Sequence, residues 1–208
     1  MRRTKEEAQQ TRNDILDAAV ALFSENGVSN TSLQDIAKQA NVTRGAIYWH
    51  FKNKAEIFDA LHVRLFQPLA EMILEDCEKD HPHPVEQLET LCVNLLLELT
   101  NNLQKRQAAR VFMIKCNYSG DQAVYKDEHE QRKTKSFELF KRYFERARDK
   151  GIIIDDTDPE ILTLSLDCYL KGIVTLYLDD PDKMDLETYA RPLIHQFFKQ
   201  FSRGQTAQ

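Results

Sequence analysis

The chain has 208 residues, of which 42 % are apolar and 29 % are charged, values that are ordinary for a soluble globular protein. No apolar run approaches the roughly 20 residues that a membrane span requires, and the first residues lack the apolar stretch of a secretory signal, so we expect a cytoplasmic protein that avoids the membrane. The net charge of -5 is unevenly spread, since residues 1–54 hold eight basic and six acidic side chains and the remainder holds twenty and twenty-seven. This asymmetry favours an anion-binding N-terminal part on an acidic body.

Hydrophobic periodicity predicts helices almost throughout, and therefore an all-α fold of about nine helices. The first helix has apolar residues at helical spacing, from Ile15 to Phe23, and Gly27 can terminate it. A second helix starts at Thr31 or Ser32, either of which can cap it. Further helices are expected from the Thr43 cap to Phe51, from Lys54 to about Glu78, from Pro84 with apolar residues as far as Leu99, through Val111 and Ile114 up to Gly120, over about 122–150, from the Asp158 cap to Leu178 and over about 185–202.

Two short helices joined by a tight turn at Asn41 and Val42 are typical of a helix-turn-helix motif. The inward positions that hold the pair together are Leu33, Ile36, Ala37, Val42, Ile47 and Phe51. The second helix then presents its first turn outward, where Gly45 and Ala46 let the backbone approach base edges in a major groove.

The side chains around this helix suit DNA. Arg44 can offer a bidentate fork to guanine, and Tyr48, His50 and Lys54 can reach phosphates. The hydroxyls and free backbone N–H groups of Thr31 and Ser32 can bind another phosphate.

The run TRGAIYWHFKNK at residues 43–54 resembles the recognition helix and following helix start of TetR-type transcriptional repressors, and the similarity extends over roughly residues 4–58. The opening RTKEEAQ at 3–9 and the run KCNY at 115–118 resemble more narrowly the AcrR-like subgroup, which represses multidrug efflux operons. Asn117 departs from that subgroup, in which this residue is usually acidic.

The resemblance implies a DNA-binding domain at residues 1–54 and a ligand-binding and dimerisation domain at residues 55–208. It places Gln34 near base edges, and it leaves open whether Trp49 contacts DNA or packs against the helix that begins at Lys54. The implied DNA-binding set is Thr31, Ser32, Gln34, Thr43, Arg44, Gly45, Ala46, Tyr48, Trp49, His50 and Lys54.

The body helices carry apolar stripes that would by default form an ordinary core. The resemblance instead implies a small-molecule cavity among them, and aromatic and thioether walls suit bulky apolar effectors. The expected lining residues are Phe66, Leu69, Met72, Phe112, Met113, Cys116, Phe137, Phe140 and Tyr169. For Cys116, a buried structural thiol is favoured over a redox sensor.

The last two helices indicate a dimer interface. Apolar side chains cover nearly the whole circumference between Ile161 and Leu178, and a helix of this kind must be buried on two sides. Two such helices from each subunit would form a four-helix bundle, with Gly172 at the crossing.

The sequence therefore predicts a homodimeric repressor that binds a palindromic DNA operator and is released by a small-molecule effector. The alternative is a regulator, including an activator, of a metabolic operon that responds to a specific metabolite. The glycine-rich loops of nucleotide-binding enzymes, the nucleophile motif of hydrolases and metal-ligand spacings such as C-x-x-C are all missing, so we expect no enzyme activity, cofactor or metal.

Overall fold

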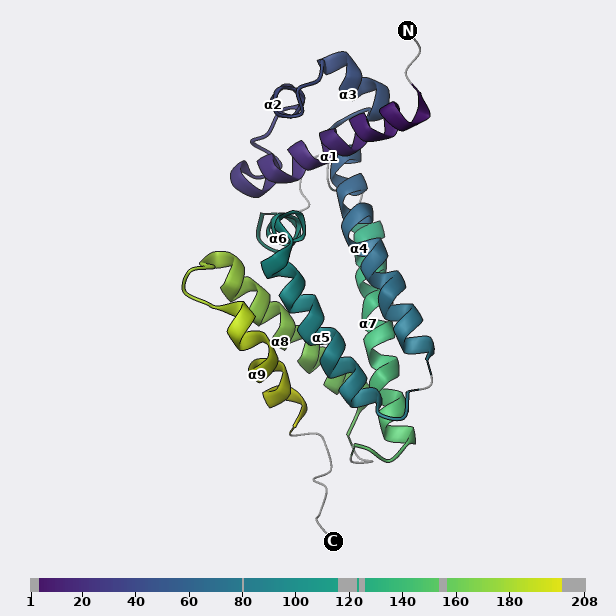
Figure 1. The fold of residues 1–208 in the computed structure, drawn as a ribbon. Helices are drawn as coiled ribbons and strands as arrows, with labels where there is room; N and C mark the ends of the chain where they lie inside the picture. The colour runs from purple at the N-terminus through teal and green to yellow at the C-terminus, as the bar shows by residue number, and fades with distance from the viewer. Residues whose placement is uncertain (1–3, 80, 116–122, 124–125, 154–156, 200–208) are drawn as a thin grey trace. The chain divides into compact units, whose positions relative to one another are not determined.

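The computed structural model describes residues 4–79, 81–115, 123, 126–153 and 157–199. Within these ranges the chain forms helices joined by turns and no strand, which confirms the predicted all-α class (Figure 1). The elements are α1 (Lys5–Asn26), α2 (Leu33–Gln39), α3 (Arg44–His50), α4 (Lys54–Glu78), α5 (Pro84–Asn101), α6 (Leu103–Arg110), η1 (Val111–Lys115), α7 (Lys126–Asp149), α8 (Pro159–Asp179) and α9 (Leu186–Phe198).

The chain divides into two compact units. The first contains Met1–Pro68 and Asn102–His129, and the second contains Leu69–Asn101 and Glu130–Gln208. The division inside α4 falls at Pro68, a residue that cannot donate a backbone hydrogen bond within the helix. The first unit is larger than residues 1–54, because the start of α4 and the α6–η1 segment pack with the N-terminal helices.

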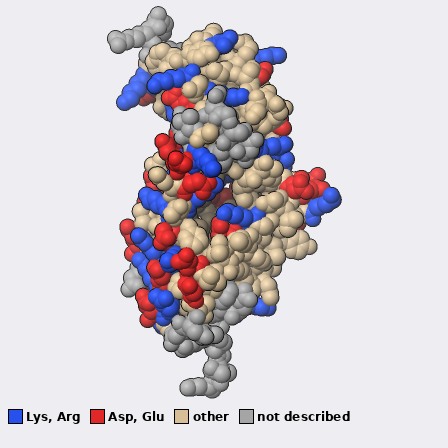
Figure 2. Space-filling model, turned by 180° about the vertical axis from the view of Figure 1, so that it is seen from behind, with Lys and Arg blue, Asp and Glu red and all other residues tan. Residues whose placement is uncertain are grey.

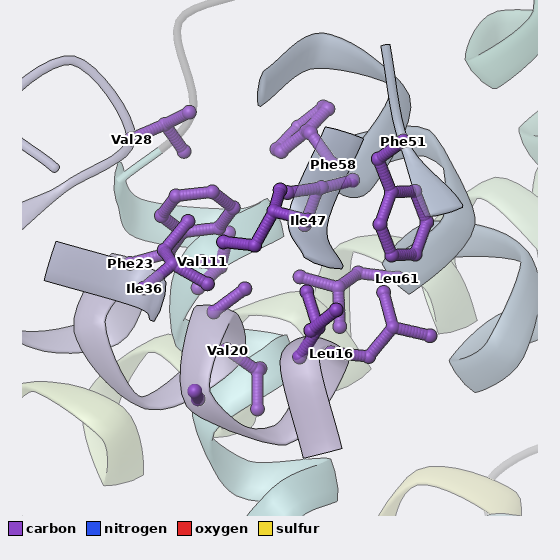
Figure 3. Packing of buried hydrophobic residues seen from close by; sticks show 14 of the residues in the cluster. Leu16, Val20, Phe23, Val28, Ile36, Ile47, Phe51, Phe58, Leu61 and Val111 are labelled. Carbon is purple, nitrogen blue, oxygen red and sulfur yellow. The ribbon is translucent and has the colours of Figure 1, made fainter. Parts of the chain in front are cut away.

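One apolar core holds the first unit together. Leu16 and Phe23 of α1, Ile36 of α2 and Ile47 of α3 are fully buried, and Val111 of η1 reaches the same cluster (Figure 3). Every helix of the helix-turn-helix therefore rests on α1, as the predicted inward positions require. Val42 and Leu33 lie at the edge of this core and are partly buried.

Local capping sets the helix boundaries of this unit. Thr4 and Glu7 form a reciprocal capping box at the start of α1, and Gly27 ends α1 with a φ of 80°, a conformation that favours glycine. Asn41 supplies the turn between α2 and α3 with a φ of 53°, which asparagine tolerates better than most residues. The predicted breaks at Gly27 and Asn41 are thus confirmed.

In the second unit α9 packs against α5 (Figure 1), and α8 contacts α9, because the Tyr169 hydroxyl donates to the Leu193 carbonyl at 3.1 Å. Tyr143 of α7 is fully buried, and its hydroxyl donates to a carboxylate oxygen of Asp76 at 2.9 Å, which fixes α7 to the end of α4. Glu89 of α5 accepts from the ring of His195 of α9 at 2.9 Å. These contacts leave one side of α8 and α9 exposed.

The segment expected as one helix through Val111 has two parts in the structure. The helix α6 runs from Leu103 to Arg110, and Asn102 caps it by accepting from the backbone of Lys105. The structure then changes to the wider η1 turn at Val111. Gly120 and Ser202, where we expected helix ends, lie outside the described residues.

Candidate nucleic-acid interface

The second helix of the motif, α3, has one face buried in the core and another face exposed. Ile47 is fully buried, whereas Arg44, Gly45 and Tyr48 are exposed. Thr43 caps the helix, because its hydroxyl accepts from the backbone of Ala46 at 3.1 Å. The first turn of α3 is therefore rigidly held and open to an external partner.

Packing within the protein does not require a glycine at position 45, in the first turn of α3. A Cβ added at Gly45 would meet only the Thr43 hydroxyl at 3.8 Å, an ordinary van der Waals distance. Because Gly45 has no side chain and that of Ala46 is short, the α3 backbone is accessible from outside. Close approach of a helix to base edges requires this accessibility.

Arg44 is held in place one turn before Tyr48. Its guanidinium donates to the Tyr48 hydroxyl at 3.1 Å and lies 5.5 Å from the centre of the tyrosine ring. Because this pair restricts the long arginine side chain, less conformational entropy is lost when the fork binds a base edge. The predicted base-reading residue is preorganised in the structure.

Trp49 is 72 % exposed, and its ring meets His50 edge-on with 4.5 Å between ring centres. The alternative in which Trp49 packs against α4 is therefore excluded by its exposure. Trp49 and Tyr48 are thus two exposed aromatic side chains of α3.

The start of α2 differs from the predicted arrangement. Ser32 alone caps the helix in a reciprocal box with Asp35, and its hydroxyl lies 2.6 Å from the Asp35 carboxylate. Hydrogen bonds from Ser32 lower the pKa of Asp35. Thr31 is only 2 % exposed, and its hydroxyl donates inward to the Gly27 carbonyl at 2.9 Å. A phosphate contact by the Thr31 side chain is therefore inconsistent with this geometry, whereas Ser32 and Gln34 are exposed as expected.

Lys54 makes hydrogen bonds within the protein. Its ammonium donates to the carbonyls of Val28 at 2.6 Å, Thr31 at 2.8 Å and Ser29 at 3.2 Å. In the absence of DNA the side chain therefore lies against the loop between α1 and α2, and its phosphate contact stays a prediction.

The predicted effector-lining residues belong to both compact units. In the first unit Phe66 and Phe112 meet with 5.4 Å between ring centres. Met113 of the same unit is exposed. The second unit contains Leu69, Met72, Phe137, Phe140 and Tyr169, and the ring of Tyr169 contacts that of Phe197 at a tilt of 30°, with 5.3 Å between ring centres. Cys116 lies outside the described residues.

Two buried histidines join the aromatic residues of the first unit, and sequence reasoning missed both. His62 and His129 stack with their rings 4.1 Å apart and 11° from parallel, and Phe112 meets both rings edge-on. The spacing of Phe58, His62 and Phe66 along one face of α4 was a readable signal for His62. Nothing in the sequence placed His129 beside it.

The exposed side of the second unit is apolar. In α8, Ile161 is 58 %, Leu164 49 % and Leu176 66 % exposed, and Tyr189 of α9 is 51 % exposed. Figure 2 shows an area of uncharged atoms over the region of α8 and α9. Among the described residues α8 is the one helix long and apolar enough to cross a membrane.

A buried helix-turn-helix core, an outward recognition helix with a preorganised arginine and a separate helical unit define a DNA-binding regulator. Residues 15–61 match the family model of bacterial regulatory proteins of the tetR family, and residues 83–203 match the C-terminal region of MAATS-type transcriptional repressors. The chain belongs to the tetR family, and the resemblance noted in the sequence is confirmed.

Similar proteins extend over nearly the whole chain. The transcriptional regulator AcrR of Shigella flexneri is 32 % identical over 93 % of this chain and 90 % of its own length. TtgR of Pseudomonas putida is 32 % identical over 89 % of each chain. Among solved structures, NalD, the secondary repressor of the MexAB-OprM multidrug efflux pump in Pseudomonas aeruginosa, superimposes with a TM-score of 0.84 at 32 % identity, covering 96 % of this chain and all of NalD.

Proposed function

We propose that this protein is a cytoplasmic repressor of a multidrug efflux operon, that it binds a palindromic operator as a homodimer, and that bulky apolar or amphipathic compounds release it. The proposal of DNA binding is supported mainly by the exposed first turn of α3. There Arg44 donates to Tyr48, and the neighbouring residues Gly45 and Ala46 have little or no side chain. The efflux assignment is supported by relatives such as NalD, which represses an efflux pump.

The homodimer is supported by the exposed apolar side of α8 and α9. A soluble monomer rarely leaves several large apolar side chains of one face in water. A second copy related by a two-fold axis would cover them and would also place two recognition helices about 34–36 Å apart, one turn of DNA. The apolar composition of α8 is thus explained by a subunit partner rather than by a membrane.

The DNA-binding part is tested by fluorescence anisotropy with labelled DNA from upstream of the protein's own gene and a shuffled duplex of equal length. We expect selective binding at moderate salt. Arg44→Ala should weaken binding by about 1–3 kcal/mol, or roughly 5- to 150-fold, and relax specificity at one base position. Arg142→Ala, which removes an exposed arginine of α7 in the other unit, is the matched control and should bind like the wild type. Equal affinity for both duplexes would contradict the proposal.

The effector part is tested with the same DNA complex. The relative SmeT has been solved in complex with triclosan, an apolar two-ring compound, which makes triclosan the first compound to titrate. Release of operator DNA at micromolar triclosan, with a parallel rise in expression of an adjacent efflux operon, is the expected result. If a panel of apolar drugs leaves the complex intact and a polar metabolite dissolves it, the efflux assignment is wrong.

A further inference from the structure

A polar cavity lies between α1, α4 and α6, all within the first compact unit. Its volume is about 390 Å³, which is at the lower end of the range for small-molecule sites. The charged side chains that line it are Asp17 of α1, Arg64 of α4 and Lys105 of α6. This lining differs from the aromatic and thioether side chains expected around an apolar effector. The cavity is therefore a separate candidate site.

Arg64 is a mostly buried cation that has too few acceptors. Its Nη1 atom lies 2.7 Å from a carboxylate oxygen of Asp17, and its side chain is 25 % exposed. The Nη2 atom of the same guanidinium is buried, and no residue that the structure describes accepts a hydrogen bond from it. A buried donor without an acceptor is costly. A carboxylate that enters the cavity would relieve this cost, since the guanidinium need only turn about its pair with Asp17.

The charges around the cavity favour an anion with a single negative group. Arg64 and Lys105 are two cations, and the carboxylate of Asp17 balances one of them. The first turn of α6 adds the positive end of the helix dipole, because Asn102 caps α6 and also lines the cavity. One carboxylate thus completes the charge balance, whereas a second would face Asp17 without a cation of its own.

Carboxamide side chains supply the rest of the polar lining, and they come from both α1 and α6. They are Gln10, Asn13, Asn102 and Gln104. A carboxamide has a donor end and an acceptor end, so it can pair with a hydroxyl group in either sense. The hydrogen bonds that Gln10 donates to Asp14 and that Asn13 accepts from Gln9 use one end of each amide. Such a lining suits a ligand that carries several hydroxyl groups.

We propose that this cavity binds a small hydroxylated monocarboxylate, of the sugar-acid class. Arg64 and Lys105 bind its carboxylate, and the carboxamides of α1 and α6 bind its hydroxyl groups. Because this ligand links α1 to α4 and α6, its binding stabilises the first unit. The proposal does not rest on operator binding or on an apolar effector, since it concerns the free protein and a different set of residues.

The probe for the first test is D-gluconate, which has one carboxylate and a chain of hydroxyl groups. D-Sorbitol has the hydroxyl groups without the carboxylate, and acetate has the carboxylate without the hydroxyl groups. At equal ionic strength, gluconate should raise the melting temperature by about 5–10 °C at a concentration 100 times its dissociation constant, and the other two compounds should have little effect. The proposal is wrong if gluconate leaves the melting temperature unchanged, or if sorbitol or acetate raises it equally.

Variants assign this binding to the cavity. Arg64→Lys keeps a positive charge beside Asp17 but loses the planar fork, so gluconate should bind at least about tenfold more weakly in calorimetric titration. Gln104→Ala removes an exposed carboxamide of the lining and should also weaken gluconate binding. Arg142→Lys, the same exchange at an exposed arginine of the other unit, is the matched control and should bind like the wild type. Wild-type affinity in both Arg64→Lys and Gln104→Ala would overturn the proposal.

Hydrogen exchange locates the bound gluconate without any substitution. Amides of residues 10–17 and 102–105 should exchange more slowly when gluconate is present, because the ligand links α1 to α6. Protection confined to the second unit would place gluconate elsewhere and contradict the proposal. Failure of the protein to select operator DNA, or of triclosan to release it, would leave these results unchanged, so the two proposals fail separately.

Discussion

Replacing Leu176 with aspartate should separate the proposed dimer into monomers. Leu176 is 66 % exposed in the single chain, the largest exposed fraction among the large apolar side chains of α8. Full burial of a leucine contributes about 1.5–3 kcal/mol, so covering the exposed two-thirds contributes about 1–2 kcal/mol per subunit and about 2–4 kcal/mol in a two-fold dimer. An aspartate loses this contribution and adds an unpaired charge to a dry interface.

The expected result is a dimer dissociation constant at least about 100-fold higher, measured by sedimentation equilibrium and light scattering. Operator affinity should fall with it, because a monomer presents one recognition helix instead of two. The melting temperature of the isolated chain should change little, since Leu176 is exposed before association. Leu103→Asp, at a leucine of α6 that is 57 % exposed, introduces the same charge in the other compact unit and should remain dimeric. The proposed interface is wrong if Leu176→Asp associates as tightly as the wild type.

Two further predictions concern polar contacts. Hydrogen bonds from Ser32 lower the pKa of Asp35 in the folded protein. The ionised Asp35 carboxylate therefore stabilises α2 above about pH 4, and this stabilisation is lost as the pH falls through the lowered pKa of Asp35. Asp35→Asn should therefore remove this acid sensitivity from thermal melts taken between about pH 6 and 2, and an unchanged profile would contradict it. Tyr143→Phe removes the hydroxyl that lies 2.9 Å from the Asp76 carboxylate and 3.3 Å from the Ile73 carbonyl. Because both acceptors lose this donor, the free energy of unfolding in urea should fall by about 1–3 kcal/mol. No loss of stability would mean that water replaces the phenol at no cost.

The fold of the helix-turn-helix region, residues 31–54, was predictable because its core follows helical spacing. Ile36, Ala37, Ile47 and Phe51 recur at positions that only a helix brings to one side, and all four are buried. Burial of apolar side chains is non-directional, so a pattern of residue types suffices to predict it. Arg44 and its neighbours lie on the same helices but outside this buried set, so their outward direction could be predicted as well.

Polar contacts were predicted less well because they depend on backbone shape. Thr31 and Ser32 are equally suited by type to cap α2, and the closure of the loop onto Gly27 selects Ser32 and turns Thr31 inward. The hydrogen bonds of Lys54 depend on where three carbonyls point, which residue types do not specify. His62 and His129 meet only because distant segments of the first unit pack together.

The two helices of the motif are attached to the molecule in different ways, and this difference bears on control. The recognition helix α3 is held by Ile47, an apolar contact that changes gradually as helices shift. The start of α2 is held by the Lys54 ammonium, whose bonds of 2.6 Å and 2.8 Å leave the hydrogen-bonding range after a displacement of about 1 Å. A signal that moves the first turn of α4 is therefore expected to loosen α2 before it disturbs α3. Release from DNA would then begin with the contacts predicted for Ser32 and Gln34, while α3 still keeps its internal geometry.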